Sequence, residues 1–171
     1  LYDQNDKTFY YDPANSFALN REHSGYIGAY DFNFSGSVGR QVYVGATFGL
    51  KDVHYRHNGL YTEDLGTQGG VALLDQTKIT GTGFDIKAGI IVRPIETSPF
   101  RIGAYVQTPT WYDLTLNNDF YCSGQTTAPY RSGESYDFKI YTPWKFGFSL
   151  GHTVGNYLAL GATYEYADYS T

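Results

Sequence analysis

The sequence has 171 residues and a net charge of −5, from 12 basic and 17 acidic side chains, so it gives no basis for a nucleic-acid-binding patch. It contains 18 tyrosines, 11 phenylalanines and 20 glycines, which indicates β-structure with two differently solvated faces. No stretch approaches the ~20 apolar residues of a membrane-spanning helix, and the one cysteine, Cys122, excludes an internal disulfide. A membrane protein of this composition would have to be a β-barrel, whose strands each carry only a weak alternating signal.

Apolar and polar side chains alternate with a period of two along six segments, as in strands with one apolar face. In chain order these segments are residues 24–35, 41–55, 83–93, 100–107, 136–151 and 157–166. In the third segment, for example, Phe84 and Ile86 fall on one face, and Asp85 and Lys87 fall on the other. We therefore predict a single all-β domain, an antiparallel meander of about six strands.

The connections between these segments alternate in length. Short turns join the first segment to the second, the third to the fourth and the fifth to the sixth, whereas residues 57–82 and 114–134 are long polar stretches that we predict to be loops. Bacterial outer-membrane barrels have short periplasmic turns and long extracellular loops. The connections therefore favour part of such a barrel over a soluble β-sandwich, which would show the same alternation along its strands. Residues 1–22 are also predicted to be loop, on the extracellular side.

The two faces of the predicted strands differ in charge. One face is free of ionised side chains, as lipid contact requires, because a charge at the bilayer midplane costs about 2–4 kcal/mol. The other face carries the candidate lumen-facing residues, which are Asp85, Lys87, Arg93, Arg101, Asp137, Lys139, Lys145 and Glu165. These side chains either guide the head group of an amphipathic ligand or form cross-strand ion pairs, and we favour the structural role. Pro109 and Pro143 are predicted to kink or end strands, because proline cannot donate to a strand ladder.

The sequence contains no residue constellation for catalysis or metal binding. His54 and His57 are three residues apart, so they would face opposite sides of a strand. Neither the spacing of a zinc-binding His-Glu-x-x-His motif nor that of a nucleophile elbow is found. We therefore predict a protein that is not an enzyme and that holds neither a cofactor nor a metal ion.

Several short stretches are specific enough to compare with a known family. The most specific are Thr108-Pro109-Thr110-Trp111-Tyr112 and Thr142-Pro143-Trp144-Lys145-Phe146, and they are accompanied by Tyr30-Asp31-Phe32-Asn33, Gly83-Phe84-Asp85-Ile86-Lys87-Ala88-Gly89 and Tyr164-Glu165-Tyr166-Ala167-Asp168. With these stretches the chain resembles the FadL/TodX transporters of hydrophobic compounds, in the form in which they occur in Bacteroidetes. The resemblance extends from about residue 23 to residue 170, apart from the two predicted loops.

The resemblance implies a bacterial outer-membrane barrel of about 14 strands, closed by an N-terminal hatch. It implies passive uptake of long-chain fatty acids or aromatic hydrocarbons, with membrane lipid and a hydrophobic small molecule as partners. The hatch and most of the strands have no counterpart here, so we expect the chain to be an internal segment of a longer protein. The alternative is a soluble or surface-exposed β-sheet module that recognises a ligand or protein through the Tyr-rich stretches 57–82 and 114–134.

Overall fold

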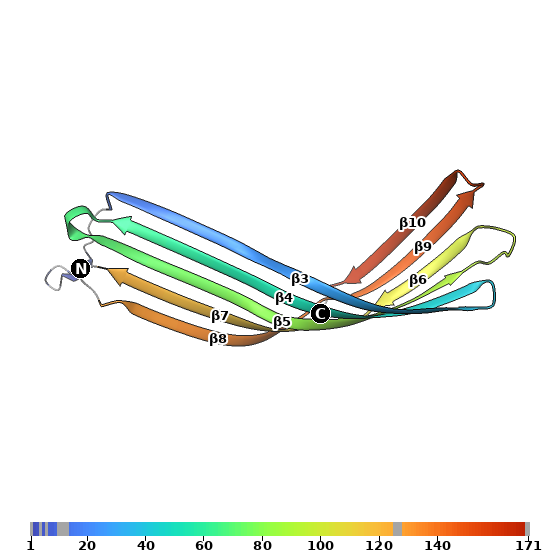
Figure 1. The fold of residues 1–171 in the computed structure, drawn as a ribbon, viewed down its shortest axis with the longest axis horizontal. Helices are drawn as coiled ribbons and strands as arrows, with labels where there is room; N and C mark the ends of the chain where they lie inside the picture. The colour runs from blue at the N-terminus through green and yellow to red at the C-terminus, as the bar shows by residue number, and fades with distance from the viewer. Residues whose placement is uncertain (1, 4, 6, 10–13, 125–127, 170–171) are drawn as a thin grey trace. The chain divides into compact units, whose positions relative to one another are not determined.

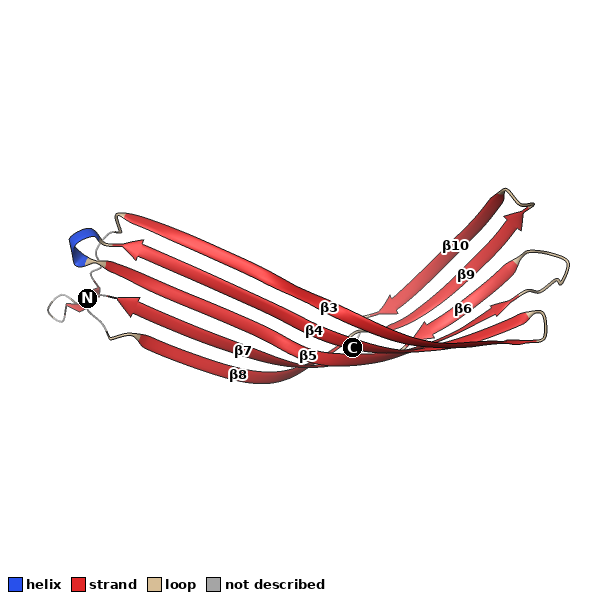
Figure 2. Ribbon diagram, viewed as in Figure 1, coloured by secondary structure: helices blue, strands red, loops and turns tan. Residues whose placement is uncertain are grey.

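The computed structural model describes residues 2–3, 5, 7–9, 14–124 and 128–169. Its strands are β1 (Tyr2–Asp3), β2 (Thr8–Phe9), β3 (Ser16–Val38), β4 (Val42–Asp64), β5 (Gly70–Val92), β6 (Arg101–Gln107), β7 (Trp111–Gly124), β8 (Tyr130–Tyr141), β9 (Trp144–Val154) and β10 (Leu158–Asp168). A single 3₁₀ turn, Gly66–Gln68, follows β4 (Figures 1 and 2). No helix in these described ranges is long and apolar enough to cross a membrane. The predicted all-β class is confirmed.

The strands form one large sheet and one small hairpin. Strands β1 and β2 pair with each other, and the other eight form a sheet in the order β10-β9-β6-β5-β4-β3, with β7 paired to β5 and β8. The pairs β5–β6, β6–β9 and β9–β10 are antiparallel, in agreement with the prediction. Figure 1 shows β6, β9 and β10 side by side.

The meander contains two interrupted strands. Strand β5 pairs with both β6 and β7, and β6 and β7 are separated only by Thr108-Pro109-Thr110. Strands β8 and β9 are likewise separated only by Thr142-Pro143, inside the segment 136–151 and at a proline that was predicted to kink or end a strand. The interruptions arise because proline lacks the amide hydrogen that a ladder needs.

The stretches 57–82 and 114–134, which we predicted to be long loops, are mostly strand. Strand β4 continues to Asp64, β5 begins at Gly70, β7 continues to Gly124 and β8 begins at Tyr130. The prediction was wrong because alternation reports a difference in solvation between two faces, and apolar and polar residues do not alternate regularly in these stretches.

The predicted N-terminal loop, residues 1–22, is also partly strand. Strand β3 begins at Ser16, and β1 and β2 precede it. Residues 1, 4, 6 and 10–13 of this stretch lie outside the described residues.

The chain divides into two compact units. Unit 1 contains residues 1–26, 54–80 and 115–136, and unit 2 contains residues 27–53, 81–114 and 137–171. In β5 of unit 2 the apolar side chains are exposed, whereas the acid between them is covered. Phe84 and Ile86 are 45% and 44% exposed, but Asp85 between them is 0% exposed. We call these two sides of unit 2 the apolar face, which carries Phe84, and the polar face, which carries Asp85.

Candidate functional site

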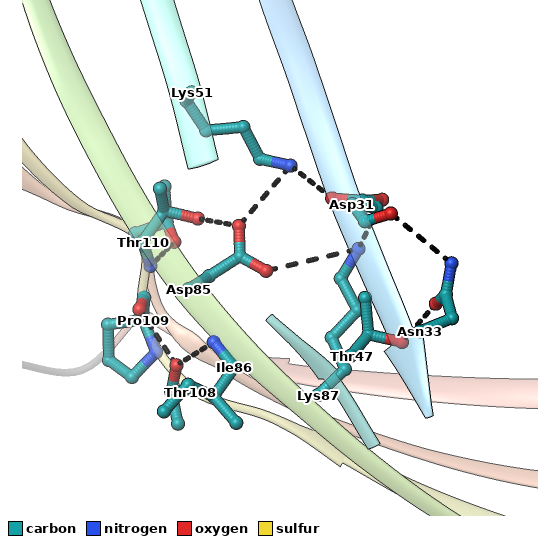
Figure 3. A network of polar contacts seen from close by, with 11 residues as sticks. Asp31, Asn33, Thr47, Lys51, Asp85, Ile86, Lys87, Thr108, Pro109 and Thr110 are labelled. Carbon is teal, nitrogen blue, oxygen red and sulfur yellow. Dashed lines mark hydrogen bonds and ion pairs between the residues drawn. The ribbon is translucent and has the colours of Figure 1, made fainter. Parts of the chain in front are cut away.

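Two carboxylates and two ammonium groups form a cluster on the polar face (Figure 3). Lys51 Nζ in β4 lies 3.1 Å from Asp31 Oδ1 in β3 and 3.5 Å from Asp85 Oδ2 in β5. Lys87 Nζ, two residues after Asp85, lies 3.8 Å from Asp31 Oδ2 and 3.9 Å from Asp85 Oδ1. The four formal charges add up to zero, so the cluster neutralises itself.

Asp85 is the fully covered member of this cluster. Its Oδ2 accepts a hydrogen bond of 3.4 Å from the Thr110 hydroxyl, while Oδ1 is buried without a hydrogen-bond donor. Burial of an ionised carboxylate is costly unless it is paired, so the two lysines are needed to keep it stable.

Gly49 provides the space for the two carboxylates. A Cβ atom at this position would lie 2.9 Å from Asp31 Oδ1 and 3.0 and 3.1 Å from the two carboxylate oxygens of Asp85. Any side chain at this point of β4 would therefore have to displace one or both acids. The absence of a side chain at residue 49 is a condition for the cluster.

Threonine hydroxyls replace the ladder bonds that are lost at the prolines. The Ile86 amide donates to Thr108 Oγ1 at 3.0 Å, and the Thr110 amide donates to Thr142 Oγ1 at 2.8 Å. The Thr142 amide in turn donates to the Thr110 carbonyl oxygen at 3.2 Å. Pro109 and Pro143, the predicted kink positions, thus lie in two neighbouring interruptions that remain hydrogen-bonded to their surroundings.

The alternation of the side chains changes phase at these interruptions. In β6, Tyr105 is the register partner of Gly89, so it lies on the polar face. In β7, Trp111 contacts Phe84 of the apolar face, with ring centroids 4.9 Å apart. Odd-numbered residues therefore lie on the polar face before Pro109 and on the apolar face after it. A bulge of one extra residue has this effect.

The phase change separates Lys139 from the other predicted lumen residues. Lys139 Nζ lies 3.9 Å from Asp113 Oδ2, and Asp113 shares the face of Trp111 because they are two residues apart in one strand. Asp137, two residues before Lys139 in β8, shares its face by the same alternation. These two residues therefore lie on the side of the apolar face, not on the polar face where the uninterrupted alternation of the sequence would place them.

The remaining predicted residues lie in three places. Asp85 and Lys87 belong to the cluster described above. Lys145 and Glu165 form a second polar group, in which Lys145 Nζ lies 3.0 Å from Glu165 Oε1 and the Tyr105 hydroxyl donates to Glu165 Oε2. The other two, Arg93 and Arg101, lie around the β5–β6 turn.

In that turn, Arg93 Nη2 donates to the Glu96 carbonyl oxygen at 3.1 Å. Arg101 is exposed at the start of β6. Neither arginine is brought to the cluster.

Sequence reasoning missed Asp31, Lys51 and Thr110 as members of the site. Asp31 and Lys51 fall on the polar faces of their segments, so the alternation contained a signal for them. The sequence offered no signal for Thr110, because its orientation depends on the interruption at Pro109.

Glycines leave a hollow on the polar face beside the cluster. A cavity of about 430 Å³ is lined by Gly45, Gly89, Gly103, Tyr105 and Lys87, among others. Within the described residues, no group of three His, Cys, Asp or Glu side chains is arranged to hold a metal ion. The paired charges and the hollow are suited to lining a passage, and they include no nucleophile activated by a base.

Comparison with known proteins assigns no family: no protein-family model matches the sequence, and no curated protein matches it at a significant level.

Proposed function

We propose that this chain is part of the wall of a bacterial outer-membrane β-barrel that takes up hydrophobic compounds by passive diffusion. The observation that carries the membrane part of the proposal is the solvation of unit 2, in which Phe84 and Ile86 are exposed and Asp85 is covered. A soluble antiparallel sheet covers its apolar face with a core. A barrel wall instead presents that face to lipid and turns its polar face towards the lumen.

The strand lengths in unit 2 support the same proposal. Strands β9 and β10 have 11 residues each, and a strand that crosses a bilayer needs about 9–11 residues. Large aromatic side chains, Trp111, Tyr141, Trp144 and Tyr169, line a shared cavity at one end of these strands. Aromatic girdles of this kind are typical of the two interfaces of outer-membrane barrels.

The substrate class rests on the resemblance to the FadL/TodX transporters. The two stretches most similar to that family, around Pro109 and Pro143, are the two strand interruptions of the sheet. The hollow on the polar face offers about 430 Å³ next to Lys87, and three glycines contribute to its wall. These features support long-chain fatty acids or aromatic hydrocarbons as the compounds taken up.

The alternative, a soluble or surface-exposed binding module, is less well supported. It required long Tyr-rich loops at 57–82 and 114–134, and these stretches are mostly strand. It also leaves the exposed apolar side chains of unit 2 without a role, because a soluble module would expose them to water.

The barrel is tested on the native protein extracted from outer membranes. We expect detergent to be needed for solubility, and we expect a gel band that shifts on boiling, with an intact mass well above 19.2 kDa. An intact mass near 19.2 kDa, in a protein that is soluble without detergent and whose gel band does not shift, would refute the barrel.

The substrate class is tested separately. Cells that lack the protein should take up a labelled long-chain fatty acid or an aromatic hydrocarbon more slowly, while the uptake of a small hydrophilic solute stays the same. If the protein shows the band shift on boiling, but cells that lack it take up both hydrophobic compounds at an unchanged rate, the substrate class is refuted and the barrel stands.

A further inference from the structure

Two like charges face each other across β4 and β5 in unit 1. These strands are joined by residues 65–69 and are antiparallel neighbours. The Gln76 side chain of β5 donates to Asn58 Oδ1 of β4 at 3.2 Å, so these two residues lie opposite each other on one face. Arg56 lies two residues before Asn58, and Lys78 lies two residues after Gln76, which makes them the next opposite pair on that face. Both side chains are exposed.

The two charges are not neutralised by the protein itself. Like charges directly opposite each other destabilise a sheet. Among the residues that the structure describes, neither Arg56 nor Lys78 forms an ion pair or a side-chain hydrogen bond, not even with Glu22 of the adjacent β3. Arg131 in the same unit is, by contrast, paired with Asp119 at 3.4 Å. A repulsion that is retained without an internal anion points to an anion from outside the chain.

A cavity of about 280 Å³ lies beside the two cations. Arg56 and Lys78 line it together with Ser24 and Thr80, which carry hydroxyl groups. A guanidinium group can donate two parallel hydrogen bonds to a phosphate, and an ammonium group and hydroxyls can donate further ones. The cavity therefore combines the charge and the donors that a phosphate group requires.

The same cavity has a flat aromatic surface. Tyr26 of β3 and His54 of β4 line it, and their rings are stacked with centroids 5.0 Å apart and planes inclined by 13°. Ring faces pack against apolar groups, while the tyrosine hydroxyl can remain in water. A phosphate attached to a sugar fits this surface better than a free phosphate does, because the C–H groups of the sugar can cover the rings.

In the proposed barrel this cavity lies on the outer side of the wall. Strand β5 has 23 residues, roughly twice the 9–11 that a crossing strand needs, so part of it projects from the bilayer. Lys78 is six residues from Phe84 in this uninterrupted strand, so both side chains leave it on the same, lipid-facing side. On that side Lys78 is the first charged residue beyond Phe84. The projecting part belongs to the end of the strand that the proposed topology places outside the cell.

We propose that this cavity binds a phosphorylated sugar of lipopolysaccharide, the glycolipid of the outer leaflet of bacterial outer membranes. Arg56 and Lys78 hold the phosphate, and the sugar ring packs on Tyr26 and His54. Basic side chains just outside a bilayer attract anionic head groups, and the phosphorylated sugars of this lipid lie at that level. The inference rests on the proposed membrane location and goes beyond uptake, because it assigns a lipid site on the outer side of the wall.

The test uses the native full-length protein, purified in a non-ionic detergent. The protein is titrated with a fluorescently labelled rough-type lipopolysaccharide, and with the same lipid after its phosphate groups have been removed by hydrofluoric acid. Binding is followed by fluorescence anisotropy. We expect the Kd of the phosphorylated lipid to be roughly three- to tenfold lower, as two exposed charge pairs allow. The difference should shrink at about 1 M salt, because exposed charges are then screened.

The double variant Arg56→Gln with Lys78→Gln should bring the ratio of the two Kd values towards one, whereas Arg56→Lys with Lys78→Arg should retain the preference. The matched control is Arg131→Gln with Lys139→Gln. It removes the same charge from two exposed side chains whose Nη2 and Nζ atoms already lie 3.4 and 3.9 Å from carboxylate oxygens. Every variant is first checked for the band shift of the folded protein. If the first double variant fails this check, Arg56→Gln and Lys78→Gln are measured singly, and each should lose part of the preference.

The outcomes separate this site from the barrel. In a protein whose band shifts on boiling, equal binding of the two lipids or binding of neither would overturn the site and leave the barrel standing. A preference that survives Arg56→Gln with Lys78→Gln, or that is lost equally in the matched control, would overturn the assignment to this cavity. Displacement of the labelled lipid by inorganic phosphate at the same concentration would identify free phosphate as the occupant and overturn the lipid. A protein that is soluble without detergent and shows no band shift would overturn the barrel, and the site with it.

Discussion

Replacing Lys51 by methionine should destabilise the fold far more than the same change at Lys87. Both ammonium groups contact Asp85, but Lys51 is 13% exposed and lies 3.5 Å from Oδ2, whereas Lys87 is 35% exposed and lies 3.9 Å from Oδ1. Methionine keeps most of the length of the lysine stem, so the substitution mainly removes charge. The comparison therefore tests whether the covered carboxylate depends on its nearer partner.

The expected magnitudes follow from burial. Removing one partner of a fully buried ion pair costs about 3–5 kcal/mol, because a charge is left without compensation. In Lys51→Met, Asp85 keeps the Lys87 contact and the Thr110 hydrogen bond, so we expect a loss of about 2–4 kcal/mol in the free energy of unfolding. Replacing the more exposed Lys87 should lower the free energy of unfolding by no more than about 1 kcal/mol.

The measurement is urea unfolding of the protein in lipid vesicles, followed by tryptophan emission. The variants are compared where the free energy of unfolding falls with urea concentration at the same slope. Adding Asp85→Asn to Lys51→Met should restore about half or more of the lost stability, because the amide keeps the shape of the side chain and removes the buried charge. Equal losses for Lys51→Met and Lys87→Met, or no recovery with Asp85→Asn, would refute the role assigned to burial.

Three further results are expected from the same preparation. Gly147→Ala should lower the free energy of unfolding by about 1–3 kcal/mol, because its Cβ would overlap the Tyr105 ring. Gly151→Ala in the same strand is the control: its Cβ would meet no atom within 4 Å, and it should change stability by no more than about 0.5 kcal/mol. Thr142→Val removes the acceptor of the Thr110 amide and should cost about 1–3 kcal/mol, as measured by the shift of the urea midpoint. In hydrogen exchange, the unit 1 parts of β4, β5 and β7 should exchange slowly, and rapid exchange throughout these parts would favour the loops that the sequence suggested.

The strands of unit 2 were predictable because their two faces are solvated differently. Phe84, Ile86 and Ile90 alternate with Asp85 and Lys87, so the period of two is visible without any knowledge of partners. The same strands continue into unit 1, where apolar and polar side chains no longer alternate regularly. The period of two disappears there, although the strands continue. Strand ends were therefore the part of the fold that the alternation of the sequence could not locate.

The candidate site was predictable only in part, because two facts about it depend on neighbouring strands. Asp31, Lys51 and Asp85 each fall on the polar face of their segment, but a meander leaves the register between strands open by steps of two residues. Their contact at 3.1 and 3.5 Å depends on that register. The face of Lys139 depends on the bulges, since one extra residue reverses every side chain that follows.

The reversal has the same consequence on both interrupted strands, and this bears on the proposed membrane boundary. On the apolar face of four strands, a charged side chain lies two residues from a large apolar one. The pairs are Leu50 and Asp52, Trp111 and Asp113, Tyr141 and Lys139, and Tyr166 and Asp168. Three of these charged residues line one cavity with Trp111, and the fourth lines the adjoining cavity that also contains Trp111, so the charges begin at one level across the sheet. A soluble sheet has no reason to align this change in four strands, whereas a lipid–water interface requires it, because a charge is costly on the lipid side and is tolerated beyond it. The paired interruptions at Pro109 and Pro143 keep that level intact, since a bulge in only one of the two strands would have placed Asp113 and Lys139 on opposite faces.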